Sequence, residues 1–203
     1  DEHGTTVVDA RIVVRRVSPA ARRYEHLAIH PYPAELARTV DLPGPRRVLI
    51  RPIRPEDAIL ERDFVRALSA QSRYLRFLYA LPELTPGMLA RFTQVDYDRE
   101  MALVAVTGGD GSERQVGVAR YTTGDDGTTG EFAIVIADDW QGTGLGRELL
   151  GSLVAIARER RLTTLAGVTL ATNTRMRKLA AGLGFAIQPH PEDGELVLMR
   201  RTL

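Results

Sequence analysis

Apolar residues recur along the 203-residue chain at two different spacings, and their order predicts the fold. A short apolar strand at 48–50 precedes a helix over about 55–69, whose Pro55-Glu-Asp57 start suits a first helical turn. Thr85-Pro86 begins another helix. Strand-like runs then follow at 101–106, 115–121 and 131–137, with the glycine-rich stretches 108–111 and 124–127 between them. Neighbouring strands joined by tight turns predict an antiparallel meander.

The pattern changes after the third of these strands. Residues 145–160 place apolar side chains on one helical stripe and charged side chains on the other face. A strand at 165–170, a helix from Asn173 that Gly184 ends, and a final hairpin of 186–187 with 196–199 complete the order. A meander followed by alternating strands and helices predicts an α/β fold with a mixed sheet.

Residues 1–45 do not have the pattern of a self-sufficient domain. Two short β-like pieces, at 7–8 and 11–17, precede a stretch that holds five prolines between positions 19 and 45. Proline fixes φ and removes a backbone donor, so this density excludes long regular structure. We therefore expect an N-terminal arm or linker over 1–45 and one folded domain over 46–203.

Composition narrows the chemistry of that domain. The chain has no cysteine, which excludes a thiol nucleophile, a disulfide and a cysteine-ligated zinc. Three of the four histidines lie in the first 30 residues, so we expect no metal site. Its 27 basic and 26 acidic residues nearly balance, which disfavours a nucleic-acid partner. With no long apolar run and no signal-peptide pattern, we expect a cytoplasmic protein without a membrane partner.

The candidate chemistry lies in the loop Ala137-Asp-Asp-Trp-Gln-Gly-Thr-Gly-Leu-Gly146, between the third meander strand and the long helix. Its three alternating glycines let a ligand approach the backbone closely, and the helix that follows presents unpaired N–H groups and a dipole that favours an anion. The loop therefore predicts a phosphate cradle. It is neither a Walker A motif, which needs a lysine, nor a dinucleotide fingerprint, because Arg147 follows Gly146.

The spacing Gln141-x-x-Gly144-x-Gly146 resembles the acyl-CoA pyrophosphate loop of the GNAT (GCN5-related N-acetyltransferase) superfamily. The segments 51–57, 72–77, 94–102, 131–138 and 173–185 are similar to the acetyltransferase domain of bacterial Pat-type protein lysine acetyltransferases. The resemblance implies a GNAT fold, with a mixed, mostly antiparallel twisted sheet flanked by helices, and acetyl-CoA as acyl donor. Segments 9–14 and 24–33 resemble the end of an acyl-CoA-synthetase-like region, so residues 1–45 would have connected two domains.

The resemblance also implies a cofactor site. Pantetheine would lie along the strand before the loop, and the loop amides would bind the pyrophosphate. Asn173 is a natural helix N-cap, and the resemblance adds a contact to the cofactor arm. The implied residues are Ile134, Val135, Ile136, Gln141, Gly142, Thr143, Gly144, Leu145, Gly146, Arg147 and Asn173.

An amine attacks a thioester only as the free base, and a lysine ammonium with a pKa near ~10.4 needs help to lose its proton at neutral pH. Glu131 begins the cofactor strand, where several members of the superfamily carry a catalytic glutamate. Asp138 and Asp139, just ahead of a helix, are better suited to stabilise the loop and the helix dipole. Asp96, Asp98 and Glu100 either line the substrate groove or pair with Arg99, and we favour a structural network.

Two features leave alternatives open. Many acetyltransferases carry a tyrosine acid where this chain has Ala180, so the acid is unassigned, with Tyr97 and Tyr121 as weak candidates. The helices before the meander usually shape acceptor specificity in this superfamily. An aromatic and basic run there either docks a protein partner or packs under the sheet. Its members are Arg73, Tyr74, Arg76, Phe77 and Tyr79.

The sequence thus predicts acetyl transfer from acetyl-CoA to a lysine of a protein, with Glu131 as general base. The resemblance implies an AMP-forming acyl-CoA synthetase as target. A small-amine acetyltransferase and a non-catalytic acyl-CoA-sensing domain are the alternatives. The chain's single lysine, Lys178, leaves such an enzyme almost no internal substrate.

Overall fold

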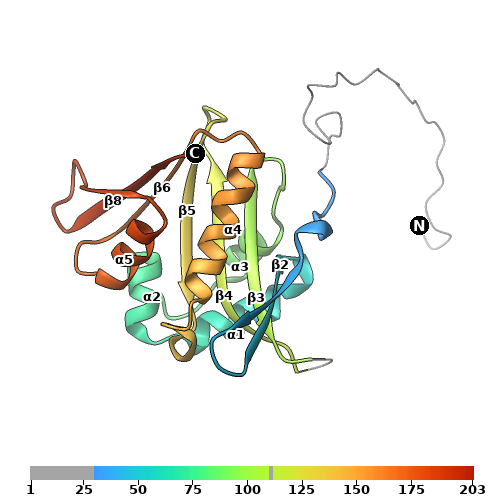
Figure 1. The fold of residues 1–203 in the computed structure, drawn as a ribbon. Coiled ribbons are helices and arrows are strands. Elements are labelled where there is room, and N and C mark those ends of the chain that lie inside the picture. Colours follow the sequence, from blue (N-terminus) through green and yellow to red (C-terminus); the bar gives the residue numbers. More distant parts are fainter. Residues whose placement is uncertain (1–29, 110–111) are drawn as a thin grey trace, which may run out of the picture.

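The computed structural model describes residues 30–109 and 112–203, which form an eight-stranded sheet in the order β1-β2-β3-β4-β5-β6-β8-β7 (Figure 1). The strands are β1 (Arg38–Leu42), β2 (Arg46–Pro52), β3 (Glu100–Thr107), β4 (Arg114–Thr123), β5 (Thr129–Ile136), β6 (Thr164–Leu170), β7 (Ala186–Pro189) and β8 (Leu196–Thr202). The α-helices are α1 (Ala58–Ala67), α2 (Ala70–Phe77), α3 (Pro86–Thr93), α4 (Leu145–Glu159) and α5 (Thr174–Gly182). Single 3-10 turns occupy Ala34–Leu36, Pro55–Asp57 and Asp138–Trp140.

The predicted meander and mixed sheet are confirmed. Strands β3, β4 and β5 pair antiparallel in sequence order, and β5 pairs parallel with β6. Every other neighbouring pair in the sheet is antiparallel. The parallel pair comes from the β5–α4–β6 crossover, which places α4 across the sheet (Figure 1).

The single helix predicted over 55–69 is wrong in detail. A 3-10 turn precedes α1, and the backbone at Leu68 is extended, with ψ 145°. Ser69 then caps a new helix by accepting a hydrogen bond from the N–H of Ser72. The aromatic and basic run at 72–80, for which the pattern predicts no helix, therefore lies largely in α2. The apolar spacing does not reveal this break, because Leu68 is a core residue and continues the helical spacing although its backbone is extended.

Part of the segment assigned to an arm is a strand. Strand β1 pairs antiparallel with β2 through a turn at Gly44, whose φ of +78° suits glycine. Pro43 and Pro45 fall in that turn and not in a strand, so the proline density did not prevent pairing. Arg38 anchors β1 to the long helix by hydrogen bonds to Glu148 and Ser152. The β-like pieces at 7–8 and 11–17 lie outside the described residues.

Helix α4 covers one face of the sheet, and α1, α2 and α3 cover the other (Figure 1). Gly117 allows the close approach of α4, because a Cβ there would lie 2.9 Å from the side chains of both Ile136 and Leu149. The predicted apolar stripe of α4 is confirmed, since its leucines at 145, 149, 150 and 153 are fully buried. Among the described residues, no helix is long and apolar enough to cross a membrane.

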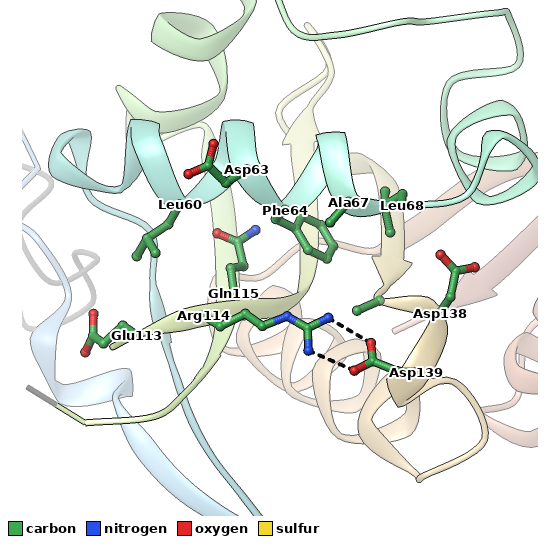
Figure 2. A pocket seen from close by; sticks show the side chains of 11 residues that line it. Leu60, Asp63, Phe64, Ala67, Leu68, Glu113, Arg114, Gln115, Asp138 and Asp139 are labelled. Atoms are coloured by element: carbon green, nitrogen blue, oxygen red, sulfur yellow. Dashed lines mark hydrogen bonds and ion pairs between the residues drawn. The ribbon is translucent and has the colours of Figure 1, made fainter. Parts of the chain in front are cut away.

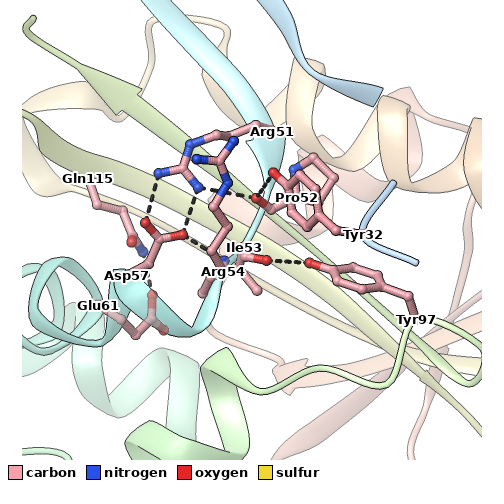
Figure 3. A network of polar contacts seen from close by, with 9 residues as sticks. All are labelled: Tyr32, Arg51, Pro52, Ile53, Arg54, Asp57, Glu61, Tyr97 and Gln115. Carbon is pink, nitrogen blue, oxygen red and sulfur yellow. Dashed lines mark hydrogen bonds and ion pairs between the residues drawn. The ribbon is translucent and has the colours of Figure 1, made fainter. Parts of the chain in front are cut away.

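A buried ion pair fixes the join between β2 and α1 (Figure 3). Both guanidinium nitrogens of Arg51 donate to the two carboxylate oxygens of Asp57, at 2.6 and 2.7 Å, and each residue is 4% exposed. The N–H of Arg54 adds a third bond to Asp57 at 2.7 Å. The hydrogen bond to Asp57 raises the pKa of Arg51, although burial opposes it. Nearby, Tyr97 donates to the carbonyl of Ile53, so the network crosses several elements.

We expect Asp57→Asn to lower the free energy of unfolding by about 3–5 kcal/mol, because it leaves the Arg51 cation buried without its partner. Urea denaturation measures this change. The matched control is Asp63→Asn, which breaks the exposed pair with Arg62 and is expected to cost no more than about 0.5 kcal/mol. Equal losses in the two variants would contradict the prediction.

Candidate active site

Strands β5 and β6 diverge after a short parallel contact. Their pairing covers only residues 129–131 against 164–166, while β5 continues along β4 to Ile136 and β6 continues along β8 to Leu170. Gly167 marks the last close approach, since a Cβ there would lie 2.9 Å from the carbonyl oxygen of Phe132. We call the opening between residues 132–136 and 167–170 the wedge.

The main chain of β5 offers unpaired groups to the wedge. The N–H of Ala137 bonds to the carbonyl of Val116 on β4, at 2.9 Å. Because bonding directions alternate along an antiparallel strand, the groups of Val135 point to β4, whereas those of Ile134 and Ile136 point into the wedge. The carbonyl of Ile136 accepts a bond from the side chain of Gln141, at 3.3 Å. An extended ligand can therefore pair with β5 as a further strand does.

The glycine loop lies at the open end of the wedge. Gly142 and Gly144 have φ of +78° and +96°, a region that disfavours other residues, and Gly144 is the N-cap of α4. Among the described residues, no acceptor bonds to the N–H groups of residues 142–146. Five consecutive free amides at a helix N-terminus can bind a phosphate or pyrophosphate. Arg147 follows them, exposed, with a bond to the carbonyl of Gly182.

A chain of hydrogen bonds connects the loop to α2 and α5. Arg175, in the first turn of α5, donates to the Gln141 side-chain oxygen at 2.6 Å, and the Gln141 amide donates to the Ser72 hydroxyl at 3.2 Å. Ser72 in turn donates to Asp138 at 2.6 Å. Sequence reasoning missed Arg175 and Ser72. The Ser69 and Ser72 spacing at a helix start was a readable signal for capping, but nothing local places Arg175 beside the loop.

Asp138 and Asp139 form structural contacts, as expected. Their partners are Ser69 and Ser72 at the start of α2 and Arg114 at the start of β4, and not the N-terminus of α4. Asp138 accepts bonds from the N–H and the hydroxyl of Ser69, at 2.8 and 2.9 Å, as well as from Ser72. Burial acts to raise the pKa of Asp138, but the bonds from Ser72 and Ser69 outweigh it and hold the pKa below its ordinary value. Asp139 forms a bidentate pair with Arg114, which lowers the pKa of Asp139.

The Arg114–Asp139 pair borders a pocket of about 400 Å³ (Figure 2). Its apolar wall comes from α1, and its polar rim from the start of β4 and the 3-10 turn at Asp138–Trp140. None of the residues expected to hold the cofactor lines this pocket. The pocket is therefore separate from the wedge.

Glu131 lies at the closed end of the wedge, on the face of the sheet that α1, α2 and α3 cover. It is opposite Thr122 in the β4–β5 register, and it is exposed. Alternation puts Glu131 on the face opposite Ile136, which contacts the α4 side. The carboxylate is thus close to the last β5–β6 contact and accessible from outside.

The remaining candidates have structural partners. Asn173 caps α5 by accepting from the N–H of Met176, as predicted, and its amide donates to Thr169. Ala180 is fully buried. Tyr97 is held by the carbonyl of Ile53, and burial raises its pKa, whereas Tyr121 is buried opposite Phe132. Neither tyrosine is placed as an obvious acid in the wedge.

The acids before the meander form the structural network that sequence reasoning favoured. Glu100 pairs with Arg91, at 2.7 Å, and not with Arg99. Asp98 lies 3.5 Å from His30, and Asp96 accepts a bond from the N–H of Asp98. They lie at the end of the sheet where β3 begins.

The aromatic and basic run, which lies on α2 except for Tyr79, divides into packed and exposed members. Arg73 donates to the carbonyls of Arg66 and Leu68, and Phe77 stacks on Phe92 with ring centroids 6.4 Å apart. Tyr74 and Tyr79 are 44% and 50% exposed. The packing expected for this run is confirmed for Arg73 and Phe77, whereas docking of a partner stays a prediction, which the exposed Tyr74 and Tyr79 would allow.

Comparison with known proteins agrees with this geometry. The family model described as the acetyltransferase (GNAT) domain matches residues 47–186. An acetyltransferase of Pseudomonas aeruginosa is 40% identical over 158 residues, which are 78% of this chain and 85% of the relative. The acetyltransferase Pat of Mycolicibacterium smegmatis is 29% identical over 136 residues, 66% of this chain but only 40% of that longer protein.

Among solved structures, the GNAT domain of S. lividans PAT superposes with a TM-score of 0.78 at 28% identity. The match covers 85% of this chain and all of that domain. A free strand edge, an amide-rich glycine loop and an accessible carboxylate therefore occur on a fold that known acetyltransferases share.

The tether between Asp138 and α2 predicts a pH-dependent contribution to stability. We expect Asp138→Asn to lower the free energy of unfolding by about 1–2 kcal/mol at pH 7, because an amide cannot accept all three bonds. A depressed folded-state pKa stabilises the protein fully above the unfolded value of about 3.9, and this contribution is lost as the pH falls through the lower folded value. The difference between wild type and variant should therefore vanish in acid.

Chemical denaturation at a series of pH values measures this difference. Asp139→Asn is the control on the same turn, and its exposed pair predicts a change of no more than about 0.5 kcal/mol. A difference for Asp138→Asn that persists unchanged in strong acid would show that the carboxylate charge is not the cause.

Proposed function

The chain belongs to the GNAT acetyltransferase family, which makes it an acyl-CoA-dependent N-acetyltransferase, and we propose that its acceptor is a lysine of a target protein. The observation that carries the proposal is the exposed Glu131 at the closed end of the wedge, next to a free strand edge. Because the Glu131 carboxylate is exposed, a lysine on the surface of a large protein can reach it. The similarity to a Pat GNAT domain supports the same acceptor class.

Acetyl-CoA is the acyl donor of this family, and in our proposal the chain binds it mainly through its backbone. Ile134 and Ile136 pair with the pantetheine, while Val135 supports the strand from the β4 side. The free N–H groups of Gly142, Thr143, Gly144, Leu145 and Gly146 hold the pyrophosphate, and Gln141 and Arg147, whose N–H groups bond to the carbonyls of Asp138 and Gly144, flank it. Asn173, as the α5 N-cap, lies on the β6 side of the wedge and contacts the cofactor arm. This set requires no metal.

Glu131 then acts as the general base. It removes a proton from the lysine ammonium, and the free amine attacks the thioester carbonyl carbon. The tetrahedral intermediate collapses with cleavage of the C–S bond, and the nitrogen loses its second proton to water or to the departing thiolate, which yields the acetylated lysine and CoA. Since Ala180 stands where many relatives have a tyrosine, the thiolate leaves without a dedicated acid or takes a proton from water.

The target we propose is an AMP-forming acyl-CoA synthetase in the cytoplasm. Tyr74 on α2 and Tyr79, just beyond its end, support docking of a protein, because exposed tyrosines are enriched at interaction hot spots. The Pat protein of Mycolicibacterium smegmatis is longer than this chain, and we propose that the residues ahead of β1 correspond to the connection with a synthetase-like region. Ala180 is the one observation that favours a second function, a non-catalytic acyl-CoA sensor.

We expect Glu131→Gln to reduce acetyl transfer to a purified acyl-CoA synthetase by about 10²-fold or more, because the base is lost while the shape is kept. The measurement uses labelled acetyl-CoA, with its affinity checked by calorimetry and expected to be unchanged. Glu159→Gln, at the far end of α4, is the control that should leave the rate unaltered. Equal rates for wild type and Glu131→Gln would remove Glu131 as the base.

The same assay separates the alternatives. Labelling of spermidine or free amino acids, but of no protein, would support a small-amine acetyltransferase. Tight binding of acetyl-CoA with no labelled product of either kind would support the sensor.

The single lysine gives a further outcome. Lys178 is exposed on α5, and arginine cannot serve as an acceptor because it stays protonated. After prolonged incubation with acetyl-CoA alone, we expect mass spectrometry to find autoacetylation only on Lys178 or on the N-terminal amine. In Lys178→Arg, only the N-terminal product should remain. Acetyl groups on any other side chain would contradict the proposed amine chemistry.

A further inference from the structure

Two arginines lie together on the face of the sheet that carries Glu131. Arg120 of β4 stacks over the ring of Phe92, 4.5 Å from its centroid, and donates to the Phe92 carbonyl at 2.9 Å. Arg76 of α2 stacks over Phe77, 4.9 Å from its centroid. Because Phe77 and Phe92 are themselves stacked, the two guanidinium groups are held by one aromatic pair.

Neither guanidinium has an anionic partner among the described residues. Arg76 forms no hydrogen bond or ion pair there, and the only bond of Arg120 is the one to Phe92. The buried carboxylate of Glu61 attracts both guanidinium groups, but its hydrogen bond comes from Gln115 and not from either arginine. Burial, together with the charge of Arg120, lowers the pKa of Arg76 to about 10. Two partly buried cations that contact no carboxylate directly are costly, because distant charges offset only part of their desolvation, and this points to an anion supplied by a ligand.

The pair lies beside the proposed base. Arg120 is directly opposite Ala133, so it shares a face with Glu131, two residues along β5. Helix α2 contacts both β5 and β6, and the charge of Glu131 acts on Arg76. An acceptor that places its amine at Glu131 thus brings its neighbouring groups to the two arginines.

We propose that Arg76 and Arg120 form an anion subsite that selects acceptors carrying a carboxylate close to the reacting amine. In a protein acceptor this group is an aspartate or glutamate flanking the target lysine. Arg76 is the residue that determines the preference, because its guanidinium has all its donors free, whereas Arg120 is partly engaged by Phe92. Polyamines, which carry further positive charge, are disfavoured. The inference rests on the proposed protein acceptor and narrows it.

The test compares three peptides that differ only beside one central lysine, where they carry glutamate, glutamine or arginine. We expect wild type to prefer the glutamate peptide over the glutamine peptide in kcat/KM by about tenfold or more, as a charge-assisted hydrogen bond allows. Arg76→Gln should abolish that preference, and the ratio of kcat/KM for the glutamate and glutamine peptides is the readout, whatever the change in the absolute rates. Arg76→Lys, which keeps the charge without the planar fork, should retain part of the preference.

Arg62→Gln, which removes an exposed positive charge from α1, is the control and should keep the full preference. Thermal unfolding checks that Arg76→Gln is folded. If it is not, Arg76→Lys against the same peptides decides the question. Equal use of the glutamate and glutamine peptides by wild type, or an unchanged preference in the Arg76 variants, would overturn the subsite.

Failure of the proposed function is distinguishable from failure of the subsite. If no peptide is acetylated, the same enzymes are assayed with an amino acid and its uncharged amide. A preference for the amino acid that is lost in Arg76→Gln would support the subsite while rejecting the protein acceptor. No preference between the two would reject both.

Discussion

The end of the β5–β6 pairing after three residues is the constraint on which the site depends. A sheet normally satisfies its main-chain groups strand by strand, and groups left open are costly unless water or a ligand bonds to them. Here β4 and β8 hold the two strands along their outer edges while their inner edges separate. Phe132 above Gly167 marks the point of divergence, since a larger residue at 167 would collide with the Phe132 ring and carbonyl. The opening is therefore set by packing within the sheet, before any ligand binds.

Hydrogen bonds connect the glycine loop, where we place the cofactor, to helix α2, where we place the acceptor. Asp138 belongs to the turn that leads into the glycine loop, yet its bonds go to Ser69 and Ser72 at the start of α2. Gln141 extends the same chain to Arg175 on α5. The helix that presents Arg76 towards Glu131 is thus held by the loop that presents free amides to a phosphate. Asp138 and Arg175 thus support the loop through hydrogen bonds, while the backbone N–H groups of residues 142–146 stay free to bind a ligand.

Two charged clusters lie on the same side of the sheet, one buried and one partly buried, and they differ in whether each charge has a bonded partner. Arg51 and Asp57 satisfy each other in bidentate geometry and fix the β2–α1 join. Arg76 and Arg120 are stacked on phenyl rings but have no carboxylate partner among the described residues. Desolvation is opposed by a directly bonded partner in the first cluster, and in the second only by carboxylates that make no contact with the guanidinium groups. Arginine therefore stabilises the fold at position 51, whereas at positions 76 and 120 we propose that it binds the acceptor substrate.

The sequence alone determined the features that depend on short-range order. Period-2 and period-3.6 apolar spacing identified the meander and α4, and the glycines at 142, 144 and 146 identified the loop, because local backbone conformation and amphipathicity are encoded within a few residues. It did not reveal the break at Leu68, where a core residue continues the helical spacing across an extended backbone. Only the tertiary structure brought Ser72, Asp138 and Arg175 to one loop, ended the β5–β6 pairing, and placed Arg76 with Arg120 near Glu131. Those contacts join residues dozens of positions apart, and long-range packing, which no local pattern records, decides them.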